Sequence, residues 1–371
     1  MKQYKNILVN ALVNLGDVVL TTSAVALLKK AYPDARITML VKPVVRQAVE
    51  NNPLIDEVMV FKYKAKDNSF GKMREMVKEI KRHHFDLSIS FDRKLRPALL
   101  CWLAGIQTRV GPSKVFDDKP SRVTWLYTDV IQIKHALNKV LQAETYQTIV
   151  REFTGIKDHA EPVFARITAE AEKKAEELLA RLPKAEKRIA LCVKGTFELK
   201  TWPKGYFVEV VEAIAERYNA AFFIVGAPND RQYADEVIKD MKQSVMNFCG
   251  ETSLVDLAAI IRRSDLLITV DTGATHIAAT TGVPMVTIYG CTSPDRWHPI
   301  NKNARVLTSR ETCCPCTVRA DECPSNPRPK CLWNITPERV LSHSYELLNG
   351  YRSLHERRNK EDICHETGRD W

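Results

Sequence analysis

The chain has 371 residues, of which 45% are hydrophobic and 27% charged, as is typical of a folded protein of two or three domains. Its longest apolar run, Pro97–Ile106, is about half the length of a membrane span, and 14 Gly and 18 Pro exclude a fibrous or low-complexity chain. The formal net charge of +10 arises within residues 1–150, where 24 Lys and Arg accompany 14 Asp and Glu.

Strand and helix patterns alternate along the first half of the chain. Short apolar runs predict strands at Ile7–Asn10, Arg36–Val41, Asp56–Phe61, Leu87–Ser90 and Thr108–Val110. Amphipathic periodicity predicts helices at Val18–Tyr32, Val44–Asn51, Phe70–His83 and Ala98–Ala104. This order predicts a parallel sheet with helices on both faces.

A polar run rich in Ala, Glu, Lys and Leu, Thr168–Leu182, predicts a helix, after which the alternation restarts. Strands are predicted at Arg188–Val193, Ala221–Val225, Leu266–Val270 and Met285–Tyr289. Helices are predicted at Tyr206–Tyr218, Tyr233–Met241, Leu254–Arg263, Thr275–Thr281 and Thr336–Leu348. The sequence therefore predicts an α/β fold with two doubly wound, Rossmann-like domains that face a cleft.

The predicted domain boundaries follow from this restart. Residues 1–165 form a first α/β domain, and residues 166–187 a polar helix or linker. Residues 188–335 form a second α/β domain with a Cys-rich loop at 313–331, followed by a C-terminal helix at 336–350. Residues 351–371 are almost all polar, which predicts a frayed tail.

The N-terminus superficially resembles a signal peptide, because Met1–Lys5 is basic and an apolar run follows. Asn10, Asn14 and Asp17 interrupt that run, and no small-residue cleavage site follows. The segment is therefore interpreted as a first strand, and the protein is expected in the cytoplasm.

Basic residues concentrated in one half indicate an anionic partner, such as nucleic acid, a membrane surface or an acidic ligand. Improved solubility is the alternative interpretation of the same charge. No nucleic-acid-binding motif and no basic patch interleaved with aromatic residues is present, so no nucleic-acid partner is expected.

Ligands of open α/β sheets bind at the carboxyl ends of the strands, and three loops at such ends carry candidate binding or catalytic residues. The first, Asn14-Leu15-Gly16-Asp17, lacks the G-x-G-x-x-G fingerprint, which counts against a nicotinamide oxidoreductase. Asp17 stands at or near a helix start. It is either an N-cap, whose carboxylate accepts a backbone N–H, or a general base that points into a cleft.

The second loop, Lys194–Pro203, carries the Lys, Thr and Gly residues that suit phosphate binding. In the third, Asp271-Thr272-Gly273 ends a strand and opens a short helix whose N–H groups attract a diphosphate. His276 lies one turn into that helix and faces either the ligand or the core. Aspartic proteases also use Asp-Thr-Gly, but they need two copies in an all-β fold.

Ten Cys residues are many for a cytosolic chain, and five of them lie between Cys313 and Cys331. Four thiolates, from Cys313, Cys316, Cys323 and Cys331, could bind a structural zinc ion tetrahedrally. Reduced thiols, a disulfide, and an iron–sulfur or redox role stay open as alternatives.

The segments Leu15–Thr22, Lys200–Pro203 and Asp271–Ala279 occur in an order and at separations that resemble glycosyltransferase family 9. These are the heptosyltransferases of the lipopolysaccharide inner core, and the resemblance runs from about residue 5 to residue 345. It implies a GT-B fold with the acceptor on the N-terminal domain and the nucleotide-sugar on the C-terminal one. It also implies inversion at the anomeric carbon, with no metal or cofactor required for catalysis.

The resemblance assigns roles residue by residue. Asp17 matches the general base, while Thr196 and Lys200 match positions that hold the donor diphosphate, with Lys200 also neutralising the departing ADP. The rest of the donor site corresponds to Asp271, Thr272, Gly273 and His276. Gly195 departs from the pattern, because family members often have a second Thr there.

The donor implied by the resemblance is ADP-L-glycero-β-D-manno-heptose. The acceptor implied is an anionic glycolipid that carries Kdo carboxylates and phosphates, at the inner face of the cytoplasmic membrane. Arg93, Lys94 and Arg96 follow a predicted strand end and are expected to bind it. The lysines at 62, 64, 66 and 72 are interpreted as membrane contacts or as solvated side chains, with basic residues worth about 1 kcal/mol each near an anionic leaflet.

The sequence thus predicts an inverting heptosyltransferase that is cytoplasmic and peripheral on the membrane. A related transferase with another nucleotide-sugar or acceptor is the first alternative. A non-enzymatic α/β protein that binds anions or nucleic acid is the second.

Overall fold

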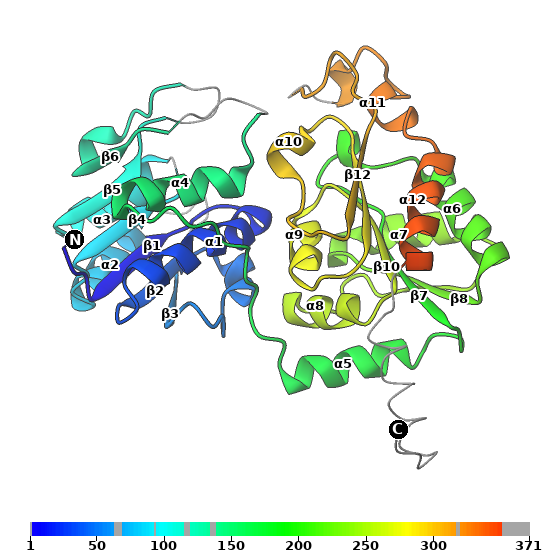
Figure 1. Cartoon of the computed structure of the whole chain (residues 1–371), viewed down its shortest axis with the longest axis horizontal. Helices are drawn as coiled ribbons and strands as arrows, with labels where there is room; N and C mark the ends of the chain where they lie inside the picture. Colours follow the sequence, from blue (N-terminus) through cyan, green and yellow to red (C-terminus); the bar gives the residue numbers. More distant parts are fainter. Residues whose placement is uncertain are drawn as a thin grey trace. The chain divides into compact units, whose positions relative to one another are not determined.

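The computed structural model describes residues 2–62, 69–92, 94–114, 119–133, 139–316 and 320–350. The chain divides into two compact units, Met1–Arg166 and Ile167–Trp371 (Figure 1). Each unit contains one six-stranded sheet in which all paired strands run parallel. The prediction of two doubly wound α/β units is confirmed.

The first unit has the strand order β3-β2-β1-β4-β5-β6. Its strands are β1 (Asn6–Asn10), β2 (Arg36–Val41), β3 (Glu57–Val60), β4 (Leu87–Ser90), β5 (Thr108–Pro112) and β6 (Asp129–Ile131). Its helices are α1 (Leu15–Ala31), α2 (Ser69–Arg82), α3 (Leu95–Leu103) and α4 (Gln142–Thr154), with 3-10 turns η1 (Pro43–Ala48) and η3 (Thr124–Leu126). The order reverses beside β1, so the loops after β1 and β4 meet at the position where such sheets bind ligands.

The second unit has the order β12-β11-β10-β7-β8-β9, which repeats the topology of the first. Its strands are β7 (Lys187–Cys192), β8 (Ala220–Ile224), β9 (Val245–Asn247), β10 (Leu266–Val270), β11 (Met285–Tyr289) and β12 (Ala304–Thr308). Its longer helices are α5 (Ala169–Leu179), α6 (Lys204–Arg217), α7 (Arg231–Ile238), α8 (Leu254–Arg262), α9 (Gly273–Thr280) and α12 (Pro337–Gly350). Shorter turns are η4 (Glu198–Lys200), η5 (Pro228–Asp230), α10 (Pro294–Trp297), η6 (Ala320–Glu322) and α11 (Lys330–Trp333).

The core of the second unit fixes the loop that follows β7. Trp202 is fully buried, and its Nε1–H donates to the carbonyl oxygen of Ile335 at 2.9 Å, just before α12. Its ring also packs edge-to-face on Phe207, with 4.9 Å between ring centroids. Because this loop is tied to the core at Trp202, the residues before it are held at the carboxyl edge of the sheet.

Four of the described strands and longer helices escaped the sequence prediction, as did the short helices α10 and α11. The strands β6 and β9 are three residues long, which is too short for a recognisable alternation, and β12 was also not predicted. The helix α4 packs against α1, as Figure 1 shows, but its buried face includes Gln142, Thr145 and Gln147. These polar residues interleave with the buried Ala143, Tyr146, Ile149 and Val150, so they interrupt the apolar stripe by which a helix is recognised.

The helix α1 begins at Leu15 rather than Val18, so Asp17 lies in its first turn and Asn14 is the N-cap. The interpretation of Asp17 as the N-cap is therefore wrong. The predicted tail at 351–371 lies outside the described residues. No helix in the described part of the chain is both long and apolar enough to cross a lipid bilayer.

Candidate functional site

In the first unit, Asp17 is held by a tyrosine from another helix. The Tyr146 hydroxyl on α4 donates a hydrogen bond of 2.7 Å to Oδ1 of Asp17. Tyr146 is 3% exposed and its ring packs on Phe91, which follows β4, with 5.3 Å between centroids. A carboxylate in the first turn is also favoured by the positive end of the helix dipole. Both effects hold the Asp17 carboxylate in a fixed orientation.

Cationic side chains share the same edge of this sheet. Burial lowers the pKa of Lys42, which follows β2, and the charge of Lys94 lowers it further, while Asp92 and Asp17 oppose the shift. The Lys42 ammonium donates to Oδ1 of Asn14 at 3.2 Å. The carboxyl edge of β1, β2 and β4 therefore carries two cations and two carboxylates within electrostatic reach of one another.

The predicted acceptor residues are only partly described. Lys94 is exposed at the N-cap of α3, and its backbone N–H donates to Oδ1 of Asp92 at 3.0 Å. Arg96 is partly buried within α3. Arg93 lies outside the described residues, as do residues 64 and 66 of the predicted membrane contacts.

In the second unit, the two predicted loops and a third one after β11 meet around one buried carboxylate. The Lys200 Nζ lies 2.6 Å from Oδ2 of Asp271, and the Thr292 hydroxyl donates to the same oxygen at 2.6 Å. Asp271 is 4% exposed, at the end of β10, while Thr292 follows β11. The carboxylate thus orients an ammonium group at the carboxyl edge of the sheet.

The helix α9 starts directly after this carboxylate. Thr272 is its N-cap, and its hydroxyl accepts a hydrogen bond of 3.0 Å from the Ala274 N–H, with Gly273 as the first helical residue. His276 is buried, and burial lowers its pKa to about 4, so the imidazole is neutral at pH 7. In the described part of the chain, Nδ1 of His276 has no hydrogen-bond partner. The structure brings Lys200, Asp271, Thr272, Gly273 and His276 to one edge, as predicted.

The departure at Gly195 has a local cause. A Cβ at this position would lie 2.5 Å from Cβ of Lys200 and 2.6 Å from its backbone oxygen. The Gly195 N–H also donates to the Thr201 hydroxyl at 3.2 Å, which closes the loop around Lys200. A threonine would not fit in this loop conformation, so Gly195 is required for the position of Lys200.

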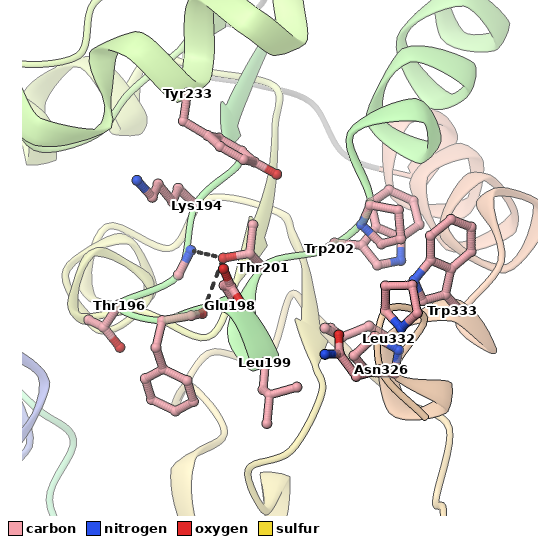
Figure 2. Close-up of a pocket in the computed structure, with 15 residues that line it drawn as sticks. Lys194, Thr196, Glu198, Leu199, Thr201, Trp202, Tyr233, Asn326, Leu332 and Trp333 are labelled. Atoms are coloured by element: carbon pink, nitrogen blue, oxygen red, sulfur yellow. Dashed lines mark hydrogen bonds between the residues drawn. The ribbon is translucent and has the colours of Figure 1, made fainter. Parts of the chain in front are cut away.

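A pocket of about 630 Å³ adjoins the same loop in the second unit (Figure 2). Thr196 lines it from the loop, Tyr233 from α7 and Trp333 from α11, and Figure 2 shows Lys194 beside Tyr233. The Lys194 Nζ lies 5.4 Å from the Tyr233 ring centroid. Thr196 is exposed, so its hydroxyl is accessible beside the pocket. Of the predicted donor residues, Thr196 lines this pocket and Lys200 does not.

The cysteine side chains of the 313–331 segment are not grouped as their spacing in the sequence suggests. Cys313 is exposed, whereas the Cys314 thiol is hydrogen-bonded to Cys331, a contact that raises the pKa of Cys314 together with burial. The Cys316 N–H donates to the carbonyl oxygen of Cys291 at 2.9 Å. Across the described ranges no group of three or more His, Cys, Asp or Glu side chains could hold a metal ion. Zinc binding by Cys313, Cys316, Cys323 and Cys331 stays a prediction.

Three residues of these two edges were not among the predicted site residues. Lys42 directly follows a predicted strand, so the carboxyl-edge rule could have found it. Thr292 belongs to the Thr-Ser-Pro segment that follows the predicted strand Met285–Tyr289, so the same rule could have found it. Tyr146 was missed because its helix was not predicted, although apolar residues recur there at helical spacing, at Ala143, Tyr146, Val150 and Phe153.

Comparisons with known proteins identify the family. The sequence model of glycosyltransferase family 9 (heptosyltransferase) matches residues 73–325. Lipopolysaccharide heptosyltransferase 2 of Escherichia coli strain K12 is 24% identical over 352 residues, covering 90% of this chain and 96% of that protein.

Two solved structures show the same fold. The glycosyl transferase family 9 structure from Veillonella parvula is 25% identical with a TM-score of 0.80, covering 94% of this chain and 98% of that one. The E. coli heptosyltransferase WaaC with ADP is 18% identical with a TM-score of 0.68, covering 92% and 99%. The family match spans more than half of the chain, and it coincides with a loop and helix start suited to a diphosphate. The chain belongs to glycosyltransferase family 9 and is a glycosyltransferase.

Proposed function

We propose that this protein transfers a heptose, with inversion, from ADP-L-glycero-β-D-manno-heptose to an anionic lipopolysaccharide inner-core acceptor. The observation that carries the proposal is the oriented Lys200 ammonium beside the start of α9, in a chain of this family. The related E. coli heptosyltransferases act on lipopolysaccharide by name, and one was solved with ADP.

The donor diphosphate binds at the start of α9, where Thr272 and Gly273 present the helix N-terminus. Lys200 leaves its ion pair with Asp271 in part and neutralises the charge that develops on the departing ADP. Thr196 contributes a hydroxyl, and Nδ1 of His276, which has no hydrogen-bond partner among the described residues, gains a polar neighbour on donor binding. No resident cofactor takes part.

Asp17 is the general base of the reaction. Its carboxylate takes the proton from an acceptor hydroxyl as that oxygen bonds to the anomeric carbon and the bond to ADP breaks on the opposite face. The Tyr146 hydroxyl donates to Oδ1 and so orients the carboxylate that receives the proton. Lys94 and Arg96, with Lys42 behind them, attract the acceptor's carboxylates and phosphates. The acceptor is lipid-anchored, so the protein works peripherally at the inner face of the cytoplasmic membrane.

Replacing Tyr146 by Phe tests how Asp17 is positioned. The variant removes one hydrogen bond to a carboxylate, worth about 1.5–3 kcal/mol, so kcat is expected to fall roughly 10- to 100-fold with KM for the donor unchanged. The acidic limb of the kcat/KM profile moves to higher pH, because a carboxylate with fewer donors holds a proton more readily. Steady-state ADP release from pH 5 to 9 measures both effects. Equal losses in KM and kcat with an unshifted profile would contradict the positioning role.

A thermal-shift series with ADP, UDP, GDP and CMP tests the donor. ADP is expected to raise Tm by roughly 5–10 °C at a concentration of 100 times its Kd, because it binds the folded form alone. The ADP-sugar is expected to raise Tm at least as far. Selective stabilisation by UDP or GDP would exclude the heptose donor, and no response to any nucleotide would exclude the transferase assignment of this site.

A further inference from the structure

The helix α3 is apolar on the face that it turns to solvent. Its sequence, LRPALLCWL, has one charged residue, Arg96. The residues buried against the unit are Pro97, Ala98, Leu100 and Cys101. At 100° per residue, Leu95, Trp102 and Leu103 lie on the opposite face, and they are 51%, 45% and 40% exposed. A helix that is apolar all round is normally buried, so this face is suited to a partner.

A second tryptophan extends the face beyond the helix. Trp125, on η3, is 65% exposed, and its ring centroid lies 6.4 Å from that of Trp102 in an edge-to-face arrangement. Beneath the pair, Val123, Leu126 and Ala98 form a buried cluster. The two rings therefore stand on a packed base rather than on a loose loop. Leu95, Trp102, Leu103 and Trp125 together are called the α3 surface.

Exposed cations stand next to the α3 surface in the sequence. Lys94 directly precedes α3 and Arg122 lies two residues before η3, and both are exposed. No Asp or Glu occurs between Asp92 and Asp117 in the sequence. A second copy of the chain would bring these same cations together across a two-fold interface, where they would repel one another. Anionic lipid headgroups complement them, and tryptophan is the residue enriched at the level of those headgroups.

We propose that the α3 surface docks the protein on an anionic lipid bilayer. Trp102 and Trp125 insert at headgroup level, while Lys94 and Arg122 contact acidic headgroups. This proposal rests on the proposed function, in which the acceptor is lipid-anchored. The start of α3 adjoins Asp92 and the edge that carries Asp17 and Lys42, so docking along α3 brings the general base to the bilayer surface.

Co-sedimentation of the full chain with vesicles tests the surface. Vesicles of phosphatidylglycerol and phosphatidylcholine in equal parts are compared with vesicles of phosphatidylcholine alone. The wild type is expected to bind the anionic vesicles, and Trp102→Ser/Trp125→Ser to lower its partition coefficient about tenfold. Arg122→Glu, which keeps both rings, is expected to lower it about tenfold through charge reversal. Both variants should fold, since the side chains changed are exposed.

Val44→Ser is the matched control, because Val44 is 80% exposed in the same unit but lies on η1. A loss of binding in Val44→Ser as large as in the double variant would overturn the assignment to the α3 surface. So would unchanged binding in the double variant, or a wild-type dimer in sedimentation equilibrium that the double variant converts to a monomer with vesicle binding intact.

Transfer assays distinguish this proposal from the proposed function. The double variant is expected to lose about tenfold of its rate on an acceptor embedded in anionic vesicles, and none on the deacylated, water-soluble acceptor. A wild type that glycosylates the soluble acceptor but binds no vesicles would overturn the docking surface alone. A wild type that binds vesicles through this surface but transfers to neither acceptor would overturn the proposed function alone.

Discussion

Replacing Asp17 by Asn is expected to lower kcat about 10²- to 10⁴-fold while KM for the ADP-sugar stays unchanged. Asparagine has the shape of aspartate and keeps an oxygen that can accept from the Tyr146 hydroxyl, so the first turn of α1 should be preserved. The amide cannot take up the acceptor proton, which is the function assigned to this carboxylate. Steady-state ADP release at saturating acceptor measures the loss.

Asp34→Asn is the matched control for this variant. Asp34 is exposed, just beyond the end of α1 in the same unit, and its substitution should leave kcat and Tm unchanged. If Asp17→Asn keeps more than a tenth of the wild-type kcat, the base lies elsewhere. Asp92 would then be the next carboxylate to test, because it is 3% exposed and belongs to the same cluster of charges.

The loops of both edges could be predicted because parallel strands place all their carboxyl ends together. Asp17, Lys200 and Asp271 each follow an apolar strand that the sequence makes plain, so the place of each at the carboxyl edge of its own sheet did not require a structure. The identity of their partners did require one. Tyr146 is 129 residues from Asp17, and the face of α4 that presents it mixes polar with apolar residues. No periodic signal connects such residues.

In the cysteine-rich segment, by contrast, the spacing of the residues did not predict which side chains are buried. The C-x-x-C spacing groups Cys313 with Cys316, but Cys313 is exposed whereas Cys316 is partly buried. Cys314, which is also partly buried, contacts Cys331 instead. Which thiol of an adjacent pair turns inward depends on how the chain packs against the core around Leu332, and the sequence pattern does not encode this. The structure likewise explains why Gly195 stands where family members often have Thr, because Lys200 approaches too closely to leave room for a side chain.

Replacing Lys200 by Ala is expected to have two separable consequences. Transfer should fall about 10²- to 10³-fold and the stabilisation by ADP should disappear, because the cation that faces the diphosphate is lost. Asp271 would then remain buried with Thr292 as its donor and without its ammonium partner, so Tm should also fall, by roughly 2–8 °C. Nucleotide titrations in a thermal-shift assay, together with steady-state kinetics, measure both consequences.

The double variant Lys200→Ala/Asp271→Asn separates the two. The amide removes the uncompensated buried charge, so most of the lost Tm should return while transfer and the ADP shift stay absent. Lys204→Ala is the matched control, since Lys204 pairs with the exposed Glu236 beyond the loop and should change neither ADP binding nor Tm appreciably. If the double variant instead recovers transfer, Lys200 serves only to balance Asp271. Because Asp271 holds Lys200 at the carboxyl edge and Gly195 leaves room for it there, we expect the ammonium itself to be required by the donor.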